Sequence, residues 1–110
     1  GKVTAKAIVR RAQASADIAS AVTYYLSEAD SDLVDRFIDE VERAIRSIAE
    51  EPATGSPRFA ELLALPGLRS RRVSGFPFLV FYVEGDRQIE VWRLLHERRD
   101  IAGALLNFAP

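Results

Sequence analysis

Apolar residues occupy both odd and even positions between Leu68 and His96. Successive side chains of a strand point to opposite faces, so this pattern predicts strands that are apolar on both sides. We expect three successive strands here, the last two joined by a hairpin turn at Gly85-Asp86, where Gly tolerates the positive φ of a tight turn. One parity carries Phe78, Val80 and Tyr82, and the other carries Leu79, Phe81 and Val83.

A two-residue turn at Gly85-Asp86 sets the register of this hairpin, and a longer turn would change it. It places Tyr82 opposite Ile89 and Val80 opposite Val91. One face of the hairpin then carries Phe78, Val80, Tyr82, Ile89, Val91 and Leu95, and the other carries Leu79, Phe81, Val83, Trp92 and Leu94.

Two amphipathic helices are predicted upstream, because apolar residues recur there at three- and four-residue spacing. The first helix should span 15–28, with Ser15 as N-cap and Asp17 in the first turn. The second should have Ser31 as its N-cap and end near Glu50 or Glu51, before Pro52. The short link between them predicts an antiparallel helical hairpin. Its apolar positions include Ile18, Val22, Phe37, Val41 and Ile45.

Shorter elements are predicted at the two ends and before the sheet. Residues 2–10 alternate as a strand whose apolar face carries Val3, Ala5, Ala7 and Val9. This strand should pair with a strand of the later meander, because unpaired backbone groups are costly. The run 59–63 could form one helical turn. Ile101, Ala104, Leu105 and Phe108 could share one side of a short C-terminal helix.

These elements predict an α+β fold in a single domain, residues 1–110. An N-terminal strand is followed by an antiparallel helical hairpin, a three-stranded antiparallel meander in one sheet, and the short C-terminal helix. The helical hairpin can cover only one face of the sheet. The other face should expose an apolar patch for a partner protein, unless the 53–66 connector or the C-terminal helix folds over it.

Composition narrows the function classes. The chain has 110 residues, a formal net charge of −1 and no Cys, so neither a disulfide framework nor thiolate chemistry is available. No apolar run approaches the roughly 20 residues needed to span a bilayer. We therefore expect a cytoplasmic protein that binds no membrane and is not a general nucleic-acid binder.

The residues that could carry chemistry are mainly arginines. His96 is the only His, no glycine-rich phosphate loop is present, and no metal-ligand set is visible, so we expect no cofactor and no metal. A ribonuclease could use an arginine set for phosphate and His96 as acid or base. The candidates for that chemistry are Arg71, Arg72, Arg93 and His96, although a lone His beside Arg is more often structural.

Several short motifs, in this order and spacing, resemble a known family. They are Asp17-Ile18, Tyr24-Tyr25, Arg36-Phe37, Pro52, Gly55-Ser56-Pro57-Arg58, Leu65-Pro66-Gly67-Leu68-Arg69, Val80-Phe81-Tyr82, Arg93-Leu94-Leu95-His96 and Arg98-Arg99-Asp100-Ile101. From about Val9 to Leu106 the chain resembles the ParE branch of the RelE/ParE toxins of bacterial type II toxin–antitoxin systems. The resemblance implies the same strand, helical hairpin and antiparallel sheet.

The resemblance also implies a function. Characterised ParE-like members stall DNA gyrase and block replication, and a cognate antitoxin wraps around the toxin and neutralises it. They generally lack the catalytic set of the RelE messenger-RNA interferases, so an enzyme is not favoured. The alternative is a ribosome-dependent endoribonuclease of the RelE type. Glu97 weakens it, because the nuclease-like relatives often have an aromatic residue after the position of His96.

The implied partners are a cognate antitoxin and DNA gyrase, with no sequence-specific DNA binding by this chain. Arginines near the sheet are the candidates for target binding: Arg69, Arg71, Arg93, Arg98 and Arg99. The second apolar face supplies the candidates for antitoxin binding: Leu79, Phe81, Val83, Trp92 and Leu94.

Overall fold

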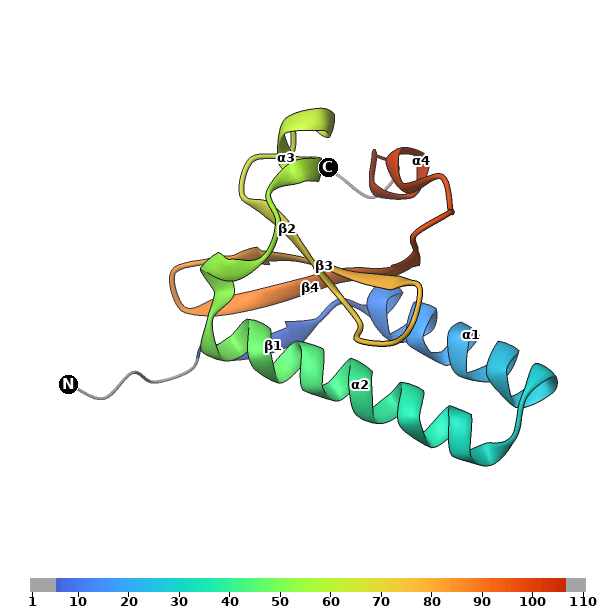
Figure 1. Cartoon of the computed structure of the whole chain (residues 1–110). Coiled ribbons are helices and arrows are strands. Elements are labelled where there is room, and N and C mark those ends of the chain that lie inside the picture. The colour runs from blue at the N-terminus through green and yellow to red at the C-terminus, as the bar shows by residue number, and fades with distance from the viewer. Residues whose placement is uncertain (1–5, 107–110) are drawn as a thin grey trace.

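Four strands form one sheet in the order β1-β4-β3-β2 in the computed structural model, which describes residues 6–106 (Figure 1). The sheet elements and helices confirm the expected α+β fold. Their bounds are β1 (Ala7–Arg10), α1 (Ala12–Glu28), α2 (Ser31–Glu50), the 3-10 turn η1 (Pro52–Thr54), α3 (Arg58–Leu63), β2 (Leu68–Arg72), β3 (Phe78–Glu84), β4 (Gln88–His96) and α4 (Ile101–Leu106).

Both long helices are present, but their first turns differ from the prediction. Helix α1 begins at Ala12, so its N-cap is Arg11 and not Ser15. The Arg11 N–H donates to the Val91 carbonyl of β4 at 3.0 Å. Helix α2 is capped by Asp30, whose side chain accepts from the Leu33 N–H at 3.0 Å. Asp17 therefore lies beyond the first turn of α1, where its carboxylate is free for a different role.

Strand β1 pairs in parallel with β4, which confirms that the N-terminal strand joins the meander. Its predicted apolar face is wrong: Ala7 and Val9 are exposed, whereas Ile8 packs against the core. Arg10 lies on the same parity as Ile8 and pairs with Glu42 of α2 at 2.8 Å. The larger apolar side chain, together with this ion pair, turns the even positions toward the helices. Val3 and Ala5 lie outside the described residues, as does Phe108 at the other end.

The register of the β3–β4 hairpin also differs from the prediction. Glu84 pairs with Ile89 and Tyr82 with Val91. The Gly85 N–H donates to the Gln88 carbonyl at 2.8 Å, so the two central residues of the turn are Asp86 and Arg87, one residue later than predicted. A bulge at Trp92 then shifts the register by one residue. As a result, Leu94 packs on the core beneath the helical hairpin and Leu95 on the opposite face, the reverse of the predicted sorting.

The sheet is covered on both faces by its own chain (Figure 1). On one face, Val80, Tyr82 and Ile89 pack against α1 and α2, as expected. On the other, α3 and α4 lie over Phe81 and Leu95, and Ile101 and Leu105 of α4 are buried there. The expectation of an uncovered second face is wrong, because the two six-residue helices supply the apolar side chains that it needs. No helix among residues 6–106 is long and apolar enough to cross a membrane.

Candidate functional site

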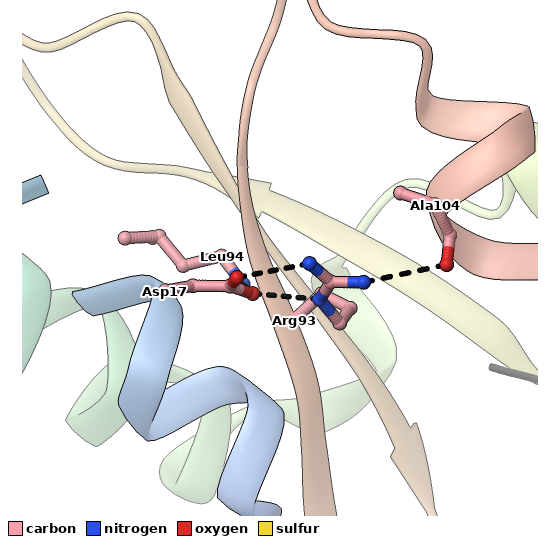
Figure 2. A network of polar contacts seen from close by, with 4 residues as sticks. All are labelled: Asp17, Arg93, Leu94 and Ala104. Atoms are coloured by element: carbon pink, nitrogen blue, oxygen red, sulfur yellow. Dashed lines mark hydrogen bonds and ion pairs between the residues drawn. The ribbon is translucent and has the colours of Figure 1, made fainter. Parts of the chain in front are cut away.

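A buried ion pair joins α1 to β4 at the centre of the candidate site (Figure 2). Arg93 makes two bonds to the Asp17 carboxylate, from Nε at 2.7 Å and from Nη2 at 2.9 Å. Each side chain is only 7% exposed. Asp17 Oδ2 also accepts from the Leu94 N–H at 3.0 Å, and Arg93 Nη1 donates to the Ala104 carbonyl of α4 at 3.3 Å. One guanidinium thus connects α1, β4 and α4.

The sheet topology explains why a carboxylate is needed at this position. Strand β1 pairs with β4 only as far as Val91, so β4 has no neighbouring strand on that side at Leu94. The Leu94 N–H would be a buried donor without a partner, and such a group costs about 1–3 kcal/mol. Asp17 fills the place of the missing strand and neutralises Arg93 at the same time. Sequence spacing could not reveal this, because the pair is 76 residues apart.

A groove runs beside this pair, between α1 and the end of β4. It consists of two hollows of about 320 Å³ and 300 Å³ that share Phe78 and His96. The first is lined by Asp17, Ser20, Arg93 and Arg99 among others, and the second by Tyr24, Tyr25 and Pro77. Tyr24 is 58% exposed at its rim. The first hollow is therefore mostly polar and the second mostly aromatic, and a concave surface that combines the two is a candidate binding site.

His96 is held by one hydrogen bond and one ring contact. Its Nδ1 accepts the Arg98 N–H at 3.1 Å, so the neutral ring carries its proton on Nε2. The ring also packs edge-on against Phe78, with centroids 5.3 Å apart. His96 is therefore a hydrogen-bonded structural residue in the wall of the groove.

The nuclease candidates do not gather around one reactive position. Arg71 belongs to β2, where Nη2 donates to Thr54 Oγ1, and it lines a hollow beside α2. Arg72 pairs with Glu97. Arg93 forms an ion pair with Asp17. Its strand, β4, lies two strands away from β2, which carries Arg71. No group of three or more His, Asp or Glu residues within 6–106 could hold a metal ion. The four candidates therefore do not form one cluster.

The candidates for target binding differ in accessibility. Arg98 and Arg99 are exposed after β4, and within the described chain no carboxylate lies at ion-pair distance from either. Arg69 is half-buried and donates to the Gly55 carbonyl at 2.7 Å. Arg93 is 6% exposed. A target could therefore reach Arg98 and Arg99 directly, whereas Arg93 would act through the elements it holds.

The candidates for antitoxin binding lie mostly beneath α3 and α4. Phe81 is fully buried, and Leu94 is 3% exposed on the opposite face of the sheet. Leu79, Val83 and Trp92 are half-buried and pack on the second core. An antitoxin could touch these three at the margins of the small helices, but reaching Phe81 requires α3 or α4 to move.

The structure thus defines a small α+β fold with a groove between α1 and the end of β4. Residues 8–101 match the model of the family described as the ParE toxin of the type II toxin–antitoxin system, parDE. The chain belongs to this ParE toxin family. Its fold is similar to a solved structure titled "Chromosomal ParDE TA system from P. aeruginosa", with a TM-score of 0.70 at 14% sequence identity. That match covers 83% of this chain and 95% of the other. No curated protein matches the chain.

Proposed function

We propose that this chain is a toxin that acts by binding DNA gyrase, and that a cognate antitoxin neutralises it by direct contact. Membership of the ParE family supports the toxin class and the antitoxin partner. The observation that carries the mode of action is the Asp17–Arg93 pair, because it removes the best-placed arginine from any phosphate chemistry. A protein that lacks a catalytic set acts through the surface it presents.

The contacts of His96 support the same conclusion. A ribonuclease needs a residue that can accept a proton and another that can donate one. His96 holds Nδ1 in a bond to the Arg98 backbone, and Arg72 is paired with Glu97. The ribosome-dependent endoribonuclease has no specific observation in its favour.

Two surfaces are proposed for the two partners. The target should meet the α1–β4 groove, the exposed Arg99 that lines it, and the neighbouring exposed Arg98. The antitoxin should reach the half-buried Leu79, Val83 and Trp92 at the margins of α3 and α4. These surfaces differ, so substitutions can separate the loss of toxicity from the loss of neutralisation.

Controlled expression in a bacterial host tests the mode of action. A gyrase-directed toxin should stop labelled thymidine incorporation before labelled leucine incorporation, because it blocks replication first. His96→Ala should leave the growth arrest unchanged, whereas Arg98→Glu/Arg99→Glu should relieve it. Arg87→Glu, in the exposed β3–β4 turn, is the matched charge control.

An early stop in leucine incorporation that His96→Ala abolishes would show translation as the target instead. Co-expression of the small protein encoded by the neighbouring reading frame should restore growth. Trp92→Ala should weaken that rescue without relieving the toxicity.

A further inference from the structure

A separate hollow of about 250 Å³ lies between α2 and the turn that follows β2. Its lining residues are mostly basic or hydroxylated: Glu40, Arg43, Ala44, Ser47, Arg71, Arg72 and Ser74. A second hollow of about 280 Å³ adjoins it, sharing Glu40, Arg43 and Ser74 and adding one basic residue, Arg36, and one acidic residue, Asp39. The two hollows together form an open channel along α2, which we call the α2 channel.

Arg71 provides a fixed positive charge in this channel. Its Nη2 donates to Thr54 Oγ1, which holds the guanidinium against η1. Its Nε is buried and has no hydrogen-bond partner among residues 6–106. Over the same residues, no carboxylate lies at ion-pair distance from Arg71. An anion in the channel would meet a cation that the protein leaves unneutralised.

Arg43 and Arg72 can turn toward the same anion at little cost. Arg43 pairs with Glu40, and Arg72 pairs with Glu97. The two arginine side chains are 65% and 56% exposed, and ion pairs as exposed as these contribute about 0–1 kcal/mol. Ser74 is exposed and adds a hydroxyl donor. Over the whole channel four arginines, Arg36, Arg43, Arg71 and Arg72, outnumber the two acidic residues, Asp39 and Glu40.

We propose that the α2 channel binds the phosphate backbone of duplex DNA, without reading its sequence. Arg and Ser side chains are the groups that proteins use for phosphate contacts. The channel is open and continues toward Arg36, which fits a chain of phosphates better than one enclosed ion. The lining holds no Asn or Gln that could read an adenine edge. This inference goes beyond gyrase binding and does not depend on it.

The net charge of −1 predicts weak binding that falls steeply with salt. Each phosphate contact contributes about −0.9 to the slope of log K against log salt. Contacts from Arg43 and Arg71 would give a slope of about −1.8, which is roughly a 12-fold loss of affinity from about 50 to 200 mM salt. Fluorescence anisotropy of a short labelled duplex with the full chain measures this directly.

Substitutions assign the binding to the channel. Arg43→Gln and Arg71→Gln should each reduce the slope by about 0.9, whereas the control Arg87→Gln should leave it unchanged. If circular dichroism shows that Arg71→Gln does not fold, the salt slope of Arg43→Gln still tests the proposal, because the Arg43 side chain faces solvent. No salt-dependent binding at the lowest salt would overturn the proposal, as would equal weakening by Arg87→Gln. Displacement of the duplex by inorganic phosphate or a poly-glutamate peptide at matched charge concentration would overturn the assignment to DNA.

Discussion

Replacing Asp17 with Ala should destabilise the domain far more than the loss of a surface ion pair. The change leaves the Arg93 guanidinium buried without its counter-charge and removes the acceptor of the Leu94 N–H. Breaking one partner of a buried pair typically costs about 3–5 kcal/mol. The free energy of unfolding of a domain of this size is roughly 5–15 kcal/mol, so Asp17→Ala should remove a large share of it. The melting temperature should fall by roughly 15 °C.

Urea unfolding followed by the fluorescence of Trp92, the only Trp, measures this loss. Arg10→Ala is the matched control, because the Arg10–Glu42 pair is 33% and 43% exposed and should contribute less than about 1 kcal/mol. The double variant Asp17→Ala/Arg93→Met should be less unstable than the sum of the single variants by about 2 kcal/mol or more. A cost for Asp17→Ala no larger than that of Arg10→Ala, or strictly additive variants, would refute this reasoning.

Three further predictions concern the packing around the sheet. Gly55→Ala should destabilise the fold by about 3 kcal/mol in urea unfolding. The new Cβ would clash with Tyr82 Oη and disrupt the bond from that hydroxyl to the Pro52 carbonyl. An unchanged unfolding midpoint would contradict this contact. Burial raises the pKa of Tyr82, as does Glu84, while the Gly55 N–H, Arg71 and Arg69 oppose the rise. The folded phenol keeps its proton where the unfolded one loses it, so stability present below about pH 10 is lost as pH rises toward the folded value. Unfolding at increasing pH should show a smaller loss for Tyr82→Phe than for the wild type, and equal losses would count against the raised pKa. Leu105→Ala should cost about 2–4 kcal/mol, because this fully buried side chain holds α4 on the sheet; faster proteolysis near residue 101 is the local readout, and protection equal to that of the exposed control Leu106→Ala would argue against the docking of α4.

The periodicity of apolar residues was sufficient for the strands and helices themselves. The stripes through Phe37 and Val41 and the meander after Leu68 were placed correctly, because each buries a regular face. The predicted hairpin register was wrong because the position of the turn, one residue later than expected, and the bulge at Trp92 are local backbone features that leave no mark on the alternation. Because of that bulge, Leu94 and Leu95 each lie on the face of the sheet that was predicted for the other.

The candidate site depended on contacts that the sequence does not encode locally. The residues around Asp17 predict only that it lies near a helix N-terminus. Its partner, Arg93, belongs to β4 and follows 76 residues later. The second sheet face was expected to need another protein, because α3 and α4 are too short for a strong periodic signal. Their few apolar residues, such as Phe59 and Leu105, nonetheless cover the face. Arg98 and Arg99 were recognisable candidates, because a charge cluster directly after a strand signals an exposed loop.

Purified gyrase with relaxed plasmid DNA tests the central claim most directly. The wild-type chain should inhibit supercoiling and accumulate cleaved DNA, His96→Ala should behave identically, and Arg98→Glu/Arg99→Glu should lose the effect. Full supercoiling at every toxin concentration, together with messenger-RNA cleavage on ribosomes that requires His96, would contradict the account of a binding toxin.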